Sequence, residues 1–171
     1  MVGEIISKNG RSFLRTGTGE DRVKAVENWL NEISSKHPST TSDLFEVCSS
    51  VIWGLKILQI DCGRTICTFI IPDRLVNEDG NWTAGAIAGM IDIICAISII
   101  AAIGEIKLSV SFNITYYTPA KSQEEVEIEG KVLFDVGKLT NVLVEIKKKR
   151  SGELVAVGKQ WMSSIATRSK I

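Results

Sequence analysis

Hydrophobic residues recur along the chain with different periods, and each period predicts a different kind of element. Over residues 20–36 the apolar positions with helical spacing are Val23, Val26, Trp29, Leu30 and Ile33. This spacing predicts an amphipathic helix that ends before Pro38. A short second helix is expected over residues 41–48, which begin with the N-cap residues Thr and Ser. Residues 1–19 show no sustained period and are expected to form a flexible tail.

After residue 50 the spacing changes to the alternation of a half-buried β-strand. Two runs rich in β-branched residues, 53–61 and 65–72, are separated by CGR and predict a β-hairpin. Four further alternating runs lie in the second half of the chain, at residues 106–118, 125–136, 140–150 and 153–164. Because only the turns PAKSQE, GK and SGE separate them, the four runs are expected to form an antiparallel meander.

Between these two groups of strands, residues 83–103 are almost wholly apolar and carry one charge, Asp92. About 20 apolar residues suffice to cross a bilayer, so a membrane span is one interpretation. The other is a buried helix that a sheet wraps. Asp92 at mid-bilayer would cost on the order of 3 kcal/mol, and the neighbouring strands need something to bury. We therefore favour the buried helix. Its small residues, which would let strands approach closely, are Gly85, Ala86, Ala88, Gly89 and Ala96.

Composition and charge exclude several classes of partner. The chain has 171 residues, 44% hydrophobic and 23% charged, which fits one globular domain. Twenty basic and twenty acidic residues cancel, so neither nucleic acid nor a membrane is an expected partner. The four cysteines have no CxxC spacing and follow no hydrophobic signal peptide. We expect reduced thiols in an intracellular protein, no metal site and no cofactor.

The single histidine limits the chemistry further. His37 stands in a polar loop beside Pro38, where an exposed side chain is expected. A Ser-His-Asp or Cys-His mechanism is therefore disfavoured. Carboxylates, hydroxyls, amides and helix ends remain as the groups that carry any reaction.

Strands, one long hydrophobic helix and more strands, in this order, predict an α+β fold of the hotdog architecture, in which an antiparallel sheet curls around a central helix. The N-terminal helix should cover an outer region. The open edge of so small a sheet is expected to pair with a second subunit, because free edges invite pairing.

Three segments carry a family resemblance. The first segment, NEDGNWTAGAIAGMIDIICAIS, follows a pattern of Asn-x-x-Gly, His-Gly-Gly and a later Asp. The second, SVSFNITYYTPAK, matches a strand with Asn-Ile-Thr-Tyr and Pro-Ala. The third, GKLTNVLVEIKKKRSGELVAVGKQW, matches a Gly-Lys turn and a terminal hairpin. Together they resemble the hotdog-fold acyl-CoA thioesterases of the phenylacetyl-CoA thioesterase type, especially the small eukaryotic members and their plant relatives. The resemblance implies hydrolysis of an acyl-CoA, with coenzyme A (CoA) as part of the substrate.

The resemblance also implies roles for single residues. Asp92 is the general base or nucleophile, and Ser109 assists it from the following strand. Asn77 helps hold the attacking water or the substrate carbonyl, and the amides of Ala84 and Gly85 form the oxyanion site. The pocket lies between subunits of a homodimer or homotetramer, so Asn77 and the helix start of one chain face Asp92 and Ser109 of the other.

Physical chemistry agrees with the oxyanion role, since a helix N-terminus presents free N–H groups and the positive end of a dipole. Each catalytic candidate also has a structural alternative. Asp92 could be a hydrogen-bonded core residue, Asn77 a turn former and Ser109 an ordinary strand hydroxyl.

Substrate contacts are expected at Trp82, Thr83, Tyr116 and Lys138. Trp82 and Tyr116 line the pocket or belong to the core. Lys138, in the Gly-Lys turn, matches a position near the CoA tail, whereas the run KKKR at residues 147–150 is interpreted as a solvated hairpin end.

The chain departs from the family at the helix start, where Thr83-Ala84-Gly85 replaces His-Gly-Gly. Threonine caps a helix but does not shuttle a proton near neutral pH, and Ala84 adds a methyl group where the thioester would approach. The alternative function is therefore a non-hydrolytic acyl or small-metabolite binding protein, or a repurposed hotdog enzyme of specialised metabolism.

The expected organisation is a tail at residues 1–19, a helical segment at 20–49, the hotdog domain at 50–165 and a tail at 166–171. The expected location is the cytoplasm. The terminal Ser169-Lys170-Ile171 resembles a peroxisomal address, which adds the peroxisome as a second location.

Overall fold

The computed structural model describes residues 18–35 and 50–164. Its elements in chain order are α3 (Gly19–Ser35), β1 (Lys56–Asp61), β2 (Arg64–Ile70), the 3-10 turn η1 (Asp73–Leu75), α5 (Ala84–Ile103), β3 (Lys107–Tyr116), β4 (Glu125–Val136), β5 (Leu139–Lys148) and β6 (Leu154–Ser164). Four expected features lie outside the described residues: the short helix over residues 41–48, His37, most of the N-terminal tail and the C-terminal Ser169-Lys170-Ile171.

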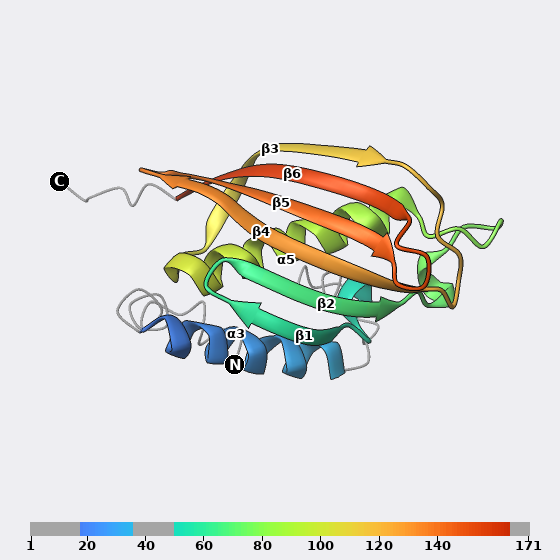
Figure 1. Ribbon diagram of the computed structural model, residues 1–171, viewed down its shortest axis with the longest axis horizontal. Helices are drawn as coiled ribbons and strands as arrows, with labels where there is room; N and C mark the ends of the chain where they lie inside the picture. Colours follow the sequence, from blue (N-terminus) through green and yellow to red (C-terminus); the bar gives the residue numbers. More distant parts are fainter. Residues whose placement is uncertain (1–17, 36–49, 165–171) are drawn as a thin grey trace.

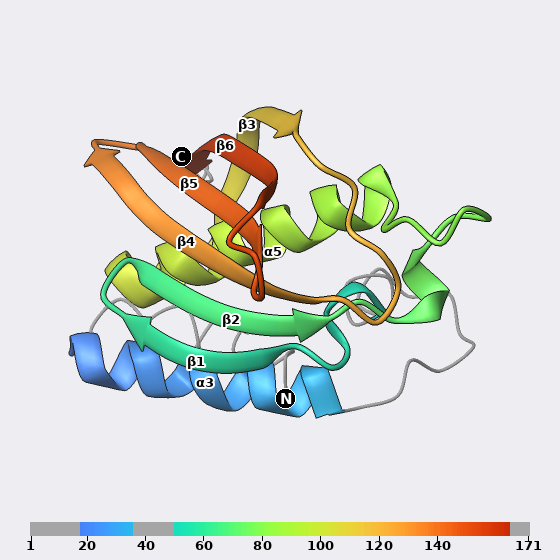
Figure 2. The same cartoon turned by 45° about the vertical axis from the view of Figure 1, so that its right-hand side comes forward.

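Six antiparallel strands form one sheet in the order β1-β2-β4-β5-β6-β3. The sheet curls around α5, and α3 lies along its β1 side (Figures 1 and 2). Helix α3 packs against both α5 and β1. The expected α+β hotdog architecture, a sheet wrapped around one long helix, is confirmed.

The expected four-strand meander is correct for β4, β5 and β6 but wrong for β3. Strand β3 pairs with β6, whereas β4 pairs with β2. The cause is the connection over residues 117–124, which is too long for a tight hairpin. Its backbone bonds with Ile71 and Gly80 direct the chain across the sheet. Strand β3 is therefore an edge strand of the described sheet.

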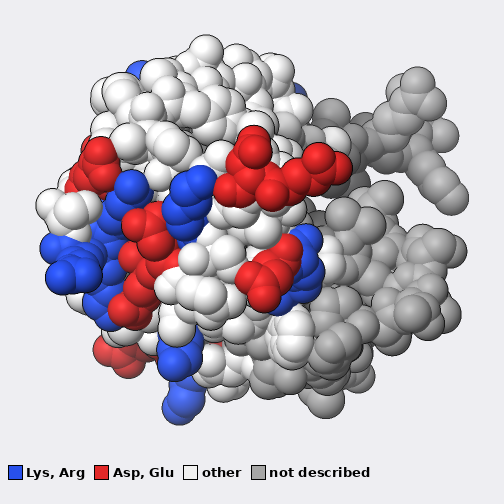
Figure 3. Space-filling model, turned by 90° about the vertical axis from the view of Figure 1, so that its right-hand side faces the viewer, with Lys and Arg blue, Asp and Glu red and all other residues white. Residues whose placement is uncertain are grey.

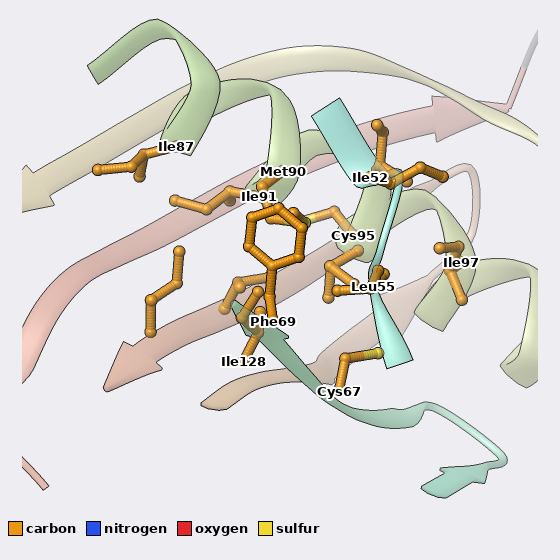
Figure 4. Packing of buried hydrophobic residues seen from close by; sticks show 14 of the residues in the cluster. Ile52, Leu55, Cys67, Phe69, Ile87, Met90, Ile91, Cys95, Ile97 and Ile128 are labelled. Carbon is orange, nitrogen blue, oxygen red and sulfur yellow. The ribbon is translucent and has the colours of Figure 1, made fainter. Parts of the chain in front are cut away.

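Helix α5 is the buried centre of the fold. It contacts all six strands and α3. Among the described residues it is the one helix long and apolar enough to cross a membrane, and most of its hydrophobic stretch is buried. Figure 4 shows Met90, Ile91 and Cys95 of α5 in one cluster with Phe69 and Ile128 of the sheet. Of the two interpretations of the apolar run, the buried helix is confirmed.

Helix α5 approaches the sheet closely at two strand glycines. A Cβ built on Gly130 of β4 would lie 2.6 Å from Ile94 Cγ2, and one on Gly158 of β6 would overlap Ile91. By contrast, a Cβ on Gly85 would meet nothing within 4 Å. The expectation that Gly85 lets a strand approach the helix closely is therefore wrong, because there is open space beside it. The strands supply the space because the helix presents long isoleucines there.

Arg22 joins α3 to the end of α5. Its guanidinium donates hydrogen bonds to the carbonyl oxygens of Ala101 (3.5 Å) and Ala102 (3.1 Å). The last carbonyls of a helix have no intrahelical partner, and its C-terminus is the negative end of the dipole. This contact and the burial of Val26 and Leu30 place α3 on the core.

Candidate functional site

Asp92, the one charged residue of α5, meets the inner face of β3 and β6. Its Oδ1 accepts hydrogen bonds from Ser109 Oγ (3.1 Å) and from Gln160 Nε2 (2.5 Å). Gln160 Nε2 also donates to Ser109 Oγ (2.6 Å). The structure therefore places Ser109 beside Asp92 and adds a third residue to the pair.

Sheet register explains why these side chains meet. Ser109 of β3 pairs with Met162 of β6, and Gln160 lies two positions earlier on the same face of β6. Gln160 was not predicted from the sequence as a site residue. One signal was available: inward positions of β6 alternate through Gly158, Gln160 and Met162, and Gln160 is the polar member.

At the start of α5 two backbone amides are free. Thr83 is the N-cap, with φ −71° and ψ 143°, and its Oγ1 accepts a hydrogen bond from the Ala86 amide (3.4 Å). The amides of Ala84 and Gly85 have no hydrogen-bond partner among the described residues, and both residues are exposed. Such amides at the positive end of a long helix can bind an anionic oxygen.

Ala84 fits this position without backbone strain. Among the described residues other than glycine, a positive φ occurs at Gln123 and not at Ala84. Ala84 therefore keeps an ordinary backbone conformation. The strain that alanine would suffer in a left-handed conformation does not arise.

Asn77 closes the loop that precedes α5. Its Oδ1 accepts a hydrogen bond from the Asn81 amide (2.9 Å), and its own amide donates to the Asn81 carbonyl (2.9 Å). The turn-forming role is therefore present. Among the described residues Nδ2 has no hydrogen-bond partner, so it is available to donate to water or to a substrate carbonyl. That second role of Asn77 stays a prediction.

The other candidates are dispersed. The Tyr116 hydroxyl donates to the Ala84 carbonyl (3.1 Å) at the helix start. Trp82 is buried, with its ring 5.8 Å from that of Phe69, so it belongs to the core. Lys138 is exposed in the β4–β5 turn, where its carbonyl accepts a hydrogen bond from the Ser164 amide.

The KKKR run is paired with acidic side chains. Lys147 contacts Glu145 (3.2 Å), Lys148 contacts Glu153 (2.9 Å) and Lys149 contacts Glu125 (2.7 Å). On the face drawn in Figure 3, basic and acidic side chains intermingle. These lysines therefore form part of a mixed surface.

Two described cysteines are packing groups. Burial raises the pKa of the Cys67 thiol to about 12. Burial, and to a lesser extent the charge of Asp92, also raises the pKa of Cys95. Within residues 18–35 and 50–164, no group of three His, Cys, Asp or Glu side chains is arranged to hold a metal ion.

The two halves of the site are far apart within one chain. Ala84 and Asp92 are eight positions apart on α5, which is about 12 Å along a helix axis. An oxyanion donor must lie within about 3 Å of the oxygen that it stabilises. Within one chain, the amides of the helix start and Asp92 therefore lie too far apart to contact the same substrate atom.

Comparison with known proteins decides the family. The family model of the thioesterase superfamily matches residues 79–155. Acyl-coenzyme A thioesterase 13 of Homo sapiens is 31% identical over 110 residues, which are 64% of this chain and 79% of the relative. The chain belongs to the thioesterase superfamily. The prediction of a thioester hydrolase is confirmed at the level of this family.

Solved structures of other thioesterases share the fold. Zebrafish thioesterase superfamily member 2 superposes with a TM-score of 0.73 at 23% identity, covering 84% of this chain and 98% of that one. A hypothetical thioesterase of Streptococcus pneumoniae, solved with coenzyme A, gives a TM-score of 0.62 at 20% identity, covering 67% of this chain and 88% of that one.

Proposed function

We propose that this thioesterase hydrolyses an acyl-CoA to a free acid and CoA, with Asp92 as the key acid. The observation that carries the proposal is the Asp92 carboxylate, held on the inner face of the sheet by Ser109 and Gln160. The choice of CoA is supported by the human relative, named as an acyl-coenzyme A thioesterase, and by the streptococcal thioesterase with coenzyme A.

In this reaction Asp92 accepts a proton from water, and the water oxygen bonds to the thioester carbon. The π electrons of the carbonyl move onto its oxygen, and the resulting oxyanion accepts hydrogen bonds from the Ala84 and Gly85 amides. When the oxyanion collapses, the C–S bond breaks and the CoA sulfur leaves with its electron pair. The proton held by Asp92 then passes to that sulfur. Direct attack by the Asp92 carboxylate, followed by hydrolysis of the anhydride, is the alternative course.

The absence of an imidazole at Thr83 does not interrupt this sequence. Asp92 is the one group that takes up and returns a proton, while Thr83 caps the helix. Water is the co-substrate, so no cofactor is required.

We place the complete site between two copies of the chain. The separation of about 12 Å between the helix start and Asp92 of one chain supports a site in which each comes from a different chain. Strand β3 lies at the edge of the described sheet and carries exposed apolar side chains, of which Leu108 is 57% and Val110 62% exposed. An apolar edge strand of this kind is suited to pairing with another copy, in a homodimer or a dimer of dimers.

The test is release of free CoA from a panel of short, long and aromatic acyl-CoAs. Asp92→Asn should lower kcat on the best substrate by about 100-fold or more, in line with loss of a general base. Asp61→Asn, on the exposed β1–β2 hairpin, is the matched control and should keep the wild-type rate.

Binding without turnover would favour the alternative function. If the wild type binds several acyl-CoAs and releases CoA from none, the chain is a non-hydrolytic binding protein or acts in another reaction. The double change Thr83→His/Ala84→Gly then separates the possibilities, because a large gain in hydrolysis would mean that the native helix start no longer supports the reaction.

A further inference from the structure

We propose that Gln160 is a positioning residue that fixes Asp92 Oδ1, so that Oδ2 is the oxygen that reacts. The inference rests on the proposed function and extends it to a residue of β6 that the helix and loop motifs do not include.

Gln160 is held firmly enough to position another group. Its side chain is fully buried. In the sheet, Gln160 lies opposite Val142 of β5 on one side and Phe112 of β3 on the other. Asn141 Nδ2 donates to the main-chain carbonyl of Gln160 (3.1 Å). A side chain anchored in the middle of three strands holds its amide in one place.

The Gln160 amide contacts both other members of the cluster. One nitrogen, Nε2, donates to Asp92 Oδ1 (2.5 Å) and to Ser109 Oγ (2.6 Å). Because the Ser109 oxygen accepts this bond, its own hydrogen is directed toward Asp92 Oδ1. Gln160 therefore orients Ser109 as well as Asp92.

The pattern of these bonds distinguishes the two carboxylate oxygens. Both donors reach Oδ1, and no described side chain donates to Oδ2. The occupied oxygen is fixed in place, and the unoccupied oxygen keeps its lone pairs for the proton of water or for the thioester carbon. When Oδ2 takes up a proton, Oδ1 becomes the carbonyl oxygen of the acid and still accepts both bonds. The cluster does not reorganise during the reaction, which is the condition for efficient preorganised catalysis.

The other end of the same amide carries an energetic penalty. Gln160 Oε1 is buried without a hydrogen-bond partner among the described residues. A buried polar atom without a partner is destabilising, and such atoms in folded proteins call for an explanation. An apolar side chain of equal length would avoid this penalty but would leave Asp92 unsupported. Retention of the amide is consistent with a role in the reaction.

The kinetic test replaces Gln160 by methionine, which keeps the length of the side chain and removes the donor. For Gln160→Met we expect kcat to fall about 10- to 100-fold while KM changes less than about threefold, because the change acts on positioning rather than on binding. Gln59→Met, at an exposed position of β1, is the control and should leave both parameters unchanged.

A double-mutant cycle separates positioning from a purely structural effect. In an Asp92→Asn background, Gln160→Met should cause less than about a twofold further loss, because the group that it positions is already disabled. Equal losses in the two backgrounds, or a change confined to KM, would overturn the proposal.

A second readout does not need turnover. In 15N NMR spectra, the Gln160 side-chain amide protons should exchange slowly with water, and Asp92→Ala should accelerate that exchange at least about tenfold as the opening free energy falls. Fast exchange in the wild type would overturn the positioning role. If no acyl-CoA is hydrolysed, the proposed function fails, and the exchange measurement still decides whether Gln160 holds Asp92.

Discussion

Thr83 and Ala84 show how the helix start keeps two free amide donors without the His-Gly-Gly residues. The Thr83 hydroxyl accepts a hydrogen bond from the Ala86 amide, which is ordinary N-capping, and leaves the amides of Ala84 and Gly85 without partners in the described structure. Ala84 has no positive φ and is exposed. The two replacements therefore remove an imidazole but retain the backbone donors.

Ala84→Pro tests the oxyanion role by removing a single N–H. Proline is favoured at the first position of a helix, and the residue before it should be extended, as Thr83 is with ψ 143°. We expect a wild-type melting temperature and a kcat for acyl-CoA hydrolysis lowered by about 100-fold, as for loss of an oxyanion donor. Ala84→Ser keeps the amide and should retain activity. An active Ala84→Pro enzyme would exclude this amide from the reaction.

At the scale of the elements, an ion pair between a buried lysine and a partly exposed aspartate joins the start of β3 to β4 and β5. The Lys107 side chain is 1% exposed, and its Nζ donates to Asp135 Oδ1 (3.0 Å) and to Thr140 Oγ1 (2.5 Å). Burial by itself would raise the pKa of Asp135, but hydrogen bonds from Thr140 and Lys107 outweigh it and hold that pKa below its usual value. The contact fixes β3, which carries Ser109 two residues later.

Asp135→Asn should destabilise the fold in a pH-dependent way. At pH 7 we expect a loss of about 2 kcal/mol in the free energy of unfolding, below the range for a fully buried pair because Asp135 is partly exposed. The unfolded carboxylate binds a proton more readily than the folded one. The contribution of Asp135 is therefore complete above about pH 5 and is lost as the pH falls through its lowered pKa.

Urea denaturation of both proteins at pH 7 and near pH 3 measures this dependence. The difference between wild type and Asp135→Asn should narrow at the lower pH. A difference of equal size at both values would mean that the charge of Asp135 does not stabilise β3. Asp61→Asn serves again as the exposed control.

For the whole molecule, the decisive question is whether two chains share one site. A site that combines the helix start of one copy with Asp92 of another makes a specific prediction for mixtures of two inactive variants. In a dimer of one Ala84→Pro chain and one Asp92→Asn chain, one site carries both changes and the other carries neither.

Co-refolding equal amounts of the Ala84→Pro and Asp92→Asn proteins should therefore restore about a quarter of the wild-type rate, since half of the dimers are mixed and each has one intact site. Size-exclusion chromatography verifies that dimers have re-formed. A rate no higher than the mean of the two separate variants, with dimers present, would place the whole site within one chain.

The positions of the elements were largely predictable because they depend on local spacing. The alternating runs at residues 125–136 and 153–164 became β4 and β6, and the apolar run became α5 within a residue or two. Thr83 as a helix cap and Asp92 as a lone acid in an apolar helix could likewise be predicted from the sequence. Each of these features depends on neighbours in sequence.

The amino-acid sequence by itself determined the period of each segment, the cap of α5 and the single charge within it, because these are properties of consecutive residues. Only the tertiary structure decided that β3 pairs with β6, that Gly130 and Gly158 receive the helix, and that Gln160 meets Asp92 and Ser109. The physical reason is that strand order and register bring together residues that are far apart in the chain. The long connection after β3 is compatible with more than one neighbouring strand for β3, and packing of the whole sheet around α5 selects β6.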